Sequence, residues 1–304
     1  TMTEFLETLI RGLGTGSVYA LLALGFVIIY KATGVISFAQ PALMLSGAVA
    51  ASYLAPALGF VLFTGLSFFI SLAGAALLTA VFALIIERLA IRPMVGRPVF
   101  VVAIITIGID IAVRVVASGF IGLGARPISN PWGLERATLL GLKVQERHIV
   151  MVGVLIVLLT GLLLFYRYTR FGLAMRAASF DQEAALTQGI SVGNVFAMSW
   201  AMAGALAAIA GTLLATNAGV DRQLWIVALV ALPAIIVGGL DSLPGAVIGG
   251  LAVGVVEAMV GSYQRDFAPW LGDNVASVSP YVLMLLVLLV KPYGIFGTAE
   301  VRRV

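Results

Sequence analysis

Long apolar stretches alternate with short arginine-rich loops along this chain. Nineteen uncharged residues separate Arg11 from Lys31, and 55 separate Lys31 from Glu87. About 20 apolar residues in a helix cross the hydrocarbon core of a bilayer, so the second stretch holds two crossings. The runs are continuous rather than alternating, which predicts helices and not a β-barrel. Nine apolar segments are predicted, at about 12–30, 34–55, 58–86, 98–122, 149–166, 192–216, 225–241, 244–263 and 279–291.

Segment 225–241 is the least regular of the nine. Pro233 interrupts it and Gly238-Gly239 ends it, so it is either a crossing or a re-entrant element. The predicted fold class is therefore all-α, a polytopic transmembrane helical bundle of about eight or nine spans. No Pro/Gly/Ser-rich linker or block of charge divides the chain, which predicts a single transmembrane domain over residues 1–304.

The composition also indicates a membrane protein. Of the 304 residues, 61% are hydrophobic and 11% are charged, and the mean hydropathy is +1.11, whereas soluble domains carry about 25% charged residues. The 34 glycines suit a bundle in which small residues bring helix backbones together. The chain has no Cys and one His, so no metal site is expected. Arginines beside the membrane account for the basic pI of about 9.6, and the expected surroundings are membrane lipid rather than nucleic acid.

Arginine density in the short loops predicts the orientation, because loops rich in Lys and Arg stay in the cytoplasm. Three such groups occur: Arg88, Arg92 and Arg97; Arg167, Arg170 and Arg176; and Arg302 and Arg303. With these groups inside, the longer loop at about 123–148 lies outside. Nine crossings then place the N-terminus outside and the C-terminus in the cytoplasm.

A short polar helix is predicted at about 179–190, between two spans on the arginine-rich side. Ser179 and Gln182 have the spacing of a capping box, in which each side chain bonds the other's backbone N–H. Asp181 and Glu183 place negative charge in the first turn, where the helix dipole favours it.

This helix continues through Ala184 and Ala185 and is predicted to end at Gly189, which suits a left-handed terminal position. At about nine residues it is too short to cross the membrane and only marginally stable alone, so it needs a surface to pack against. It is either an interfacial helix resting on lipid head groups or a coupling helix seated in a groove of a soluble partner. The residues alone leave both interpretations open.

The segment Glu183-Ala184-Ala185, followed by Gly189, resembles the EAA-x-x-x-G coupling motif of ATP-binding-cassette importer permeases. Four stretches in order resemble the branched-chain amino acid permeases of such importers: GTGSVYALLALGFVIIYKATGVISFAQ (Gly14–Gln40), TRFGLAMRA (Thr169–Ala177), ALPAIIVGGLDSLPGAVIGGLAVGVVEA (Ala231–Ala258) and VKPYGIFG (Val290–Gly297). The resemblance covers nearly the whole chain except the loop around 123–147. Relatives commonly read N-F-A-[QH]-G and then an acid after the first span, whereas this chain has Ser37, Pro41 and Ala42.

The resemblance implies a permease subunit of an ATP-driven importer for branched-chain or related amino acids in a bacterial plasma (inner) membrane. Its implied partners are a second homologous permease, two cytoplasmic ATPase subunits and an extracytoplasmic solute-binding protein. The chain has no G-x-x-x-x-G-K-[ST] phosphate loop, so ATP and Mg are expected on the ATPases, with no cofactor and no enzymatic activity on this chain. The implied ATPase-coupling residues are Arg170, Arg176, Asp181, Glu183, Ala184, Ala185 and Gly189.

Away from their ends, the predicted spans contain three charged residues: Asp110, Arg114 and Glu257. Asp110 and Arg114 are four residues apart, so they share a helix face and can pair. They form either a structural ion pair or part of a relay, and in the second case the chain would be an ion-coupled secondary transporter that uses Asp110/Arg114 or Glu257. Polar candidates for the translocation pathway are Ser17, Tyr19, Gln40 and Asn217.

Backbone breaks near the C-terminal third are marked by Gly238, Gly239, Pro244 and Gly245. They indicate either close helix packing or a hinge for translocation. Three classes of protein remain: an importer permease, an autonomous secondary transporter and a membrane-embedded enzyme. The coupling motif favours the first, and no nucleophile–base constellation in the sequence supports the third.

Overall fold

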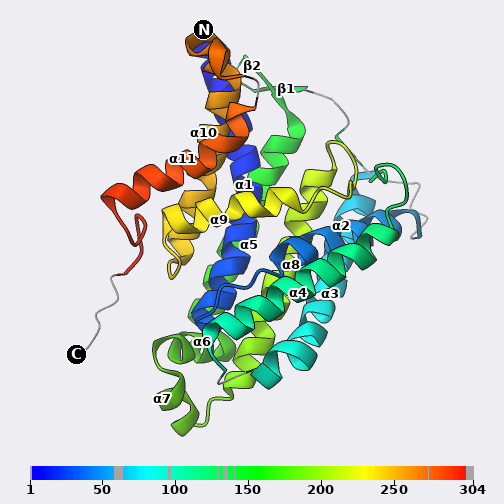
Figure 1. Cartoon of the computed structure of the whole chain (residues 1–304). Helices are drawn as coiled ribbons and strands as arrows, with labels where there is room; N and C mark the ends of the chain where they lie inside the picture. The colour runs from blue at the N-terminus through cyan, green and yellow to red at the C-terminus, as the bar shows by residue number, and fades with distance from the viewer. Residues whose placement is uncertain are drawn as a thin grey trace. The chain divides into compact units, whose positions relative to one another are not determined.

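The computed structural model describes residues 2–57, 64–94, 97–128, 130–132, 136–139, 141–272 and 274–298. Helices dominate it (Figure 1). Each of the nine predicted apolar segments contains a helix: α1 (Met2–Thr33), α2 (Gln40–Ala57), α3 (Thr64–Ile86), α4 (Val99–Gly119), α5 (Glu146–Tyr168), α8 (Val192–Ala215), α9 (Ile226–Gly238), α10 (Leu243–Phe267) and α11 (Val275–Val290). Within the described residues, six helical stretches are long and apolar enough to cross a membrane. The prediction of a polytopic helical membrane protein is thereby confirmed.

Several boundaries differ from the prediction. The second segment begins later than predicted, because Gly34 has a φ of +71° and α2 starts only at Gln40. The start of the third predicted segment, residues 58–63, lies outside the described residues. Helix α9 has 13 residues, which gives a length of about 20 Å and falls short of a straight crossing of about 30 Å.

Helix α6 (Arg170–Phe180) and helix α7 (Gln182–Thr187) follow α5. A short helix was predicted at about 179–190, where α7 lies, whereas α6 was not predicted. A hairpin of β1 (Arg136–Leu139) and β2 (Leu142–Gln145) lies in the loop that was predicted outside, and its strands pair antiparallel. A π-helical turn at Glu87–Ile91 and a 3₁₀ turn at Arg92–Met94 extend α3.

The chain divides into two compact units. The α10 unit comprises residues 1–27, 132–155 and 228–304, and the α8 unit comprises residues 28–131 and 156–227. The single transmembrane domain over residues 1–304, predicted from the absence of a linker, stays a prediction. Here each unit is assembled from separate stretches of the chain, so no linker is needed.

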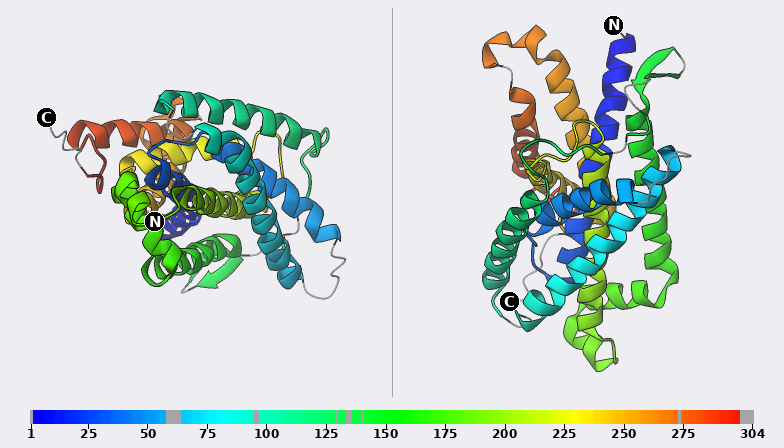
Figure 2. Two further views of the ribbon diagram at one scale, coloured as in Figure 1. Left: turned by 90° about the horizontal axis from the view of Figure 1, so that it is seen from below. Right: turned by 90° about the vertical axis from the view of Figure 1, so that its right-hand side faces the viewer.

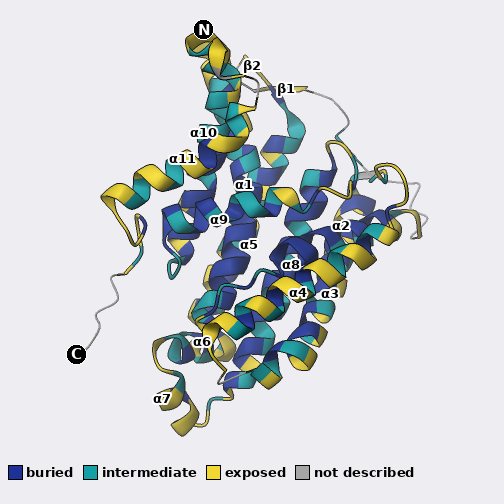
Figure 3. Cartoon of the chain, in the orientation of Figure 1, coloured by how far each residue is buried: buried dark blue, intermediate teal, exposed yellow. Residues whose placement is uncertain are grey.

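Helix α8 is the core of the α8 unit. It packs against α2 and α3, and α4 packs against α2 (Figure 2). Small residues make this packing possible: a Cβ added at Gly211 would lie 2.5 Å from the backbone oxygen of Met44, and one added at Gly204 would lie 2.9 Å from that of Thr79. Most of α8 is buried, while α4 leaves broad apolar faces exposed (Figure 3). Exposed aliphatic side chains are what a helix at the lipid boundary requires.

In the α10 unit, α1 and α10 meet along a seam of small residues. A Cβ added at Gly12 would lie 2.7 Å from the Cα of Val255, and one added at Gly16 would lie 2.9 Å from the Cα of Leu251. On the other side, a Cβ at Gly254 would overlap the backbone of Gly16. This spacing of small residues at every fourth position lets helix backbones approach closely in lipid.

The C-terminal segment of the α10 unit completes the end of α9. The backbone N–H groups of Ile295 and Phe296 donate to the carbonyls of Val237 and Gly238, at 2.8 and 3.0 Å. These carbonyls lie in the last turn of α9, where no intrahelical partner exists. These hydrogen bonds join Ala231–Ala258 and Val290–Gly297, two of the stretches that carry the family resemblance, although more than 30 residues separate them in the sequence.

Candidate functional site

Helix α6 folds back closely on the end of α5. Thr169 caps α6 by accepting a hydrogen bond from the Gly172 N–H at 2.9 Å, and the Arg176 side chain donates to the Tyr166 carbonyl. A Cβ at Gly172 would overlap the carbonyl oxygen of Phe165. The stretch TRFGLAMRA is therefore a tight helix–helix corner, in which Gly172 permits the approach and Arg176 fixes it. Arg170 is the first residue of α6.

The predicted capping box of the short helix is wrong. Ser179 belongs to α6, where its hydroxyl donates to the Arg176 carbonyl at 2.7 Å. The cap of α7 is Asp181, whose Oδ1 accepts from the N–H groups of Glu183 and Ala184 at 2.9 and 3.0 Å. Because Asp181 adopts an extended conformation at the corner between α6 and α7, it occupies the capping position itself.

The predicted end of this helix is confirmed. Gly189 has a φ of +80°. The Gly189 N–H donates to the Leu186 carbonyl and the Ile190 N–H to the Ala185 carbonyl, both at 3.0 Å. These two bonds make a Schellman motif, which requires the left-handed residue that glycine provides. Ala185 is also the buried contact of α7, with 4% of its surface exposed.

Polar contacts join α7 to the end of α1, and the end of α3 to the start of α8. The Gln182 side chain donates to the carbonyl of Ala32, at the end of α1, at 3.0 Å. Arg92, after α3, donates to the carbonyl of Gly193 at the start of α8 at 2.8 Å and pairs with the buried Glu87 at 3.1 Å. Two of the predicted cytoplasmic arginine groups therefore lie at the same end of this unit. The third, Arg302 and Arg303, lies outside the described residues.

The α6–α7 corner presents large apolar side chains at its surface. Five of them are more than 45% exposed: Tyr168, Phe171, Leu173, Phe180 and Leu186. Helix α7 is the most exposed part of this end of the chain in Figure 3. An exposed apolar cluster next to polar residues is typical of a surface that meets a partner.

Asp110 and Arg114 form the predicted pair on α4, with a distance of 2.6 Å. Two further contacts, which the sequence did not indicate, hold the pair. The Asp110 carboxylate accepts from the Ala42 N–H at 3.0 Å, in the first turn of α2. The Arg114 guanidinium lies 3.7 Å from the ring centroid of Trp225. The ion pair is thus embedded in contacts that fix α4 against α2, which favours a structural role.

We expect Asp110→Ala to destabilise the chain by about 3–5 kcal/mol, because it leaves a cation unpaired and removes the cap of α2. The measurement is the midpoint temperature for loss of monodisperse protein in heated detergent extracts. The double variant Asp110→Asn/Arg114→Gln removes both charges and should recover most of the loss. A stable Asp110→Ala protein that has lost only transport would point to a relay instead.

The four pathway candidates are distributed over both units. Ser17 is buried and donates to the Leu13 carbonyl of its own helix at 2.7 Å, while Tyr19 is buried and donates to Glu257 at 2.6 Å. In the α8 unit, Gln40 is fully buried and its amide donates to the Ala203 carbonyl at 3.3 Å. Its Oε1 has no hydrogen-bond partner among the described residues. Asn217 is exposed after the end of α8. Their role in a pathway stays a prediction.

The glycines and proline after α9 form a closely packed turn. Gly238 and Gly245 approach so closely that a Cβ on either would overlap the other's backbone, and Gly239 has a φ of +109°. Ser242 caps α10 by accepting from the Gly245 N–H at 3.1 Å, and Pro244 lies in its first turn. These residues are needed for packing; a hinge at this position stays a prediction.

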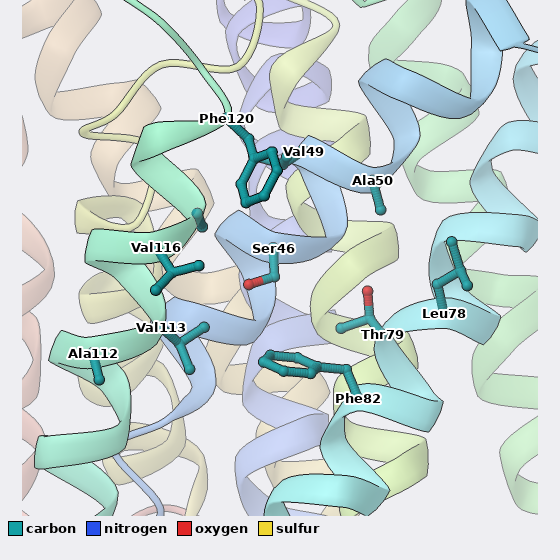
Figure 4. Close-up of a pocket in the computed structure, with 11 residues that line it drawn as sticks. Ser46, Val49, Ala50, Leu78, Thr79, Phe82, Ala112, Val113, Val116 and Phe120 are labelled. Atoms are coloured by element: carbon teal, nitrogen blue, oxygen red, sulfur yellow. The ribbon is translucent and has the colours of Figure 1, made fainter.

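An apolar cavity of about 520 Å³ lies between α2, α3 and α4 (Figure 4). Aliphatic side chains, Phe82 and Phe120 line it together with Ser46 and Thr79. Sequence reasoning missed this cavity, because its lining residues look like ordinary membrane-helix positions.

Residues 8–289 match the family described as "Branched-chain amino acid transport system / permease component". This chain belongs to that family. It is 31% identical to the high-affinity branched-chain amino acid transport system permease protein LivH of Escherichia coli (strain K12), over 99% of this chain and 98% of the relative. It is 32% identical, with the same coverage, to the corresponding permease protein BraD of Pseudomonas aeruginosa. The predicted family and the assignment to a transport permease rather than an enzyme are confirmed.

A solved structure agrees with the fold. PsaBC from Streptococcus pneumoniae in complex with Fab matches with a TM-score of 0.54 and 15% identity, over 97% of this chain and 98% of that chain. At this identity the likeness concerns the fold alone.

Proposed function

We propose that this chain is a permease subunit of an ATP-binding-cassette importer for branched-chain or related amino acids. The observation that carries the proposal is the match to the permease family over residues 8–289. The absence of a phosphate loop from the sequence supports ATP and Mg binding on separate ATPase subunits. A second homologous permease and an extracytoplasmic binding protein complete the proposed complex, in a bacterial plasma membrane.

The α6–α7 corner is the proposed docking site for an ATPase subunit. It combines exposed apolar side chains, such as Phe171 and Leu186, with the arginines Arg170 and Arg176. Helix α7 has only six residues and would not be stable in isolation. Asp181 and Gly189 fix its two ends. A short helix must be held at both ends in this way if it is to transmit force.

The contacts of this corner suggest how ATPase closure reaches the membrane. Movement of α7 would pull on the Gln182–Ala32 hydrogen bond and so on the end of α1. The Arg92 contact to Gly193 joins the ends of α3 and α8 in the same way. Alternating access would follow from the coupled shift of these helix ends.

The proposed topology has eight or nine crossings with the α6–α7 corner in the cytoplasm. In the α10 unit, the N–H of Lys143 in the hairpin donates to Glu7 of α1 at 2.8 Å, so the hairpin lies beside the N-terminal end of α1. Both were predicted outside. The proposed C-terminus is cytoplasmic.

We expect uptake of radiolabelled leucine into proteoliposomes only when the chain is reconstituted with its second permease and ATPases, ATP inside and the binding protein outside. The matched control replaces ATP with a non-hydrolysable analogue. Uptake by this chain alone under an ion gradient would contradict the proposal and favour a secondary transporter. The embedding of Asp110 and Arg114 in packing contacts gives that alternative little support.

A further inference from the structure

Glu257 and Tyr19 meet near the middle of two helices of the α10 unit. Glu257 lies 14 residues after the start of α10 and 10 before its end. The Tyr19 hydroxyl donates to Glu257 Oε2 at 2.6 Å, and Tyr19 is only 4% exposed. Nothing in the sequence pairs these residues, because 238 positions separate them.

The α1–α10 seam holds this pair in place. Gly16 lies one turn before Tyr19, and Gly254 lies one turn before Glu257. A Cβ at Gly254 would overlap the backbone of Gly16, and one at Gly16 would lie 2.9 Å from the Cα of Leu251, so neither position has room for a side chain. The carboxylate and the hydroxyl are therefore carried on two helices locked together beside them, and their position is fixed before any ligand arrives.

The charge of Glu257 is not balanced within the described part of the chain. Among the residues that the structure describes, no basic side chain lies within 4.0 Å of it; the salt bridges Arg92–Glu87 and Arg114–Asp110 belong to the α8 unit. A carboxylate offers about four acceptor positions, and Tyr19 fills one. Glu257 is only partly buried. An ionisable residue at membrane depth requires a partner or water, and generally marks a ligand path.

We infer that Glu257, oriented by Tyr19, binds the ammonium group of the amino acid during its passage through the permease. This inference rests on the proposed function for the identity of the solute. The ligand chemistry is that of a cation with N–H donors. A basic side chain of the second permease has the same chemistry, and the experiment separates the two sources.

The test is a thermal-shift titration of the intact permease–ATPase complex in nanodiscs, without the binding protein. Three probes separate the contributions of the two charged groups of leucine. They are leucine itself, 3-methylbutylamine, which keeps only the ammonium group, and 4-methylpentanoate, which keeps only the carboxylate. Leucine and the amine should raise the melting temperature, and the acid should not. Glu257→Gln should weaken the amine's apparent affinity about tenfold to a hundredfold, the range for loss of a hydrogen bond to a charged group.

Tyr19→Phe keeps the charge and removes its positioning bond, so it should weaken the amine several-fold less than Glu257→Gln does. Asp266→Asn removes an exposed acid from the same helix and should change nothing. Undiminished amine binding in Glu257→Gln would overturn the inference while leaving the proposed function intact. Loss of the second permease from the Glu257→Gln complex would also overturn the inference. Glu257 would then bind a basic side chain of the second permease and not the ammonium group of the amino acid. Glu257-dependent amine binding in a complex that transports no amino acid would support the site and refute the proposed function.

Discussion

Replacing Gly254 by alanine should destabilise the chain by about 3 kcal/mol, near the upper end of the usual cost of overpacking. An added Cβ would overlap the Cα and N of Gly16, and a backbone cannot rotate away as a side chain can. The helices α1 and α10 must separate for even one methyl group to fit. We expect a large fall in the melting temperature of the solubilised protein, measured by size-exclusion chromatography after heating.

Gly261 provides the matched control on the same helix. A Cβ at this position would lie 3.4 Å from the Cβ of Ala276, which is an ordinary contact. Gly261→Ala should therefore be neutral or stabilising by up to about 1 kcal/mol, because alanine favours the helix. The same substitution is thus expected to lower the stability of the protein at one position and not at the other, seven residues away. Equal melting temperatures for the two variants would show that the seam does not hold the helices together.

The positions of the helices were predictable because a membrane span has a required length. Apolar runs of about 20 residues gave a helix in each of the nine segments. The ends were less predictable, since they depend on local turns and on partners. Gly34 delays α2, and α1 extends back to Met2 through Glu4 and Glu7. There the hairpin supplies a partner for Glu7, through the Lys143 N–H.

The candidate site was predictable only where its contacts are local in sequence. Asp110 and Arg114 are four residues apart, and the left-handed glycine at 189 follows from helix geometry. The choice between Ser179 and Asp181 as a cap depends on where α6 ends, which the sequence pattern did not show. The contacts of Tyr19 with Glu257 and of Gln182 with Ala32 depend on how distant helices pack. No periodicity along the chain encodes such pairings.

Gly189→Val should weaken the coupling between transport and ATP hydrolysis while leaving the protein folded. A non-glycine residue in the left-handed region costs about 1–2 kcal/mol, and a β-branched residue is the least tolerated. A Cβ at Gly189 would meet no atom within 4 Å, so the effect is one of backbone conformation and not of packing. In a helix of six residues this cost is enough to undo the Schellman motif. We expect substrate-stimulated ATPase activity of the reconstituted complex to fall about tenfold, the equivalent of about 1.4 kcal/mol.

Gly189→Asn separates backbone conformation from the simple loss of glycine. Asparagine enters the left-handed region with little penalty, so this variant should retain most of the stimulated activity. Both variants should show wild-type membrane insertion and melting temperature, because α7 lies at the surface and contributes little to the core. If valine and asparagine reduced activity equally, the loss would come from a contact that the ATPase makes with glycine itself. Full activity in Gly189→Val would instead mean that α7 does not transmit the ATPase movement, and the coupling role would have to be sought in α6.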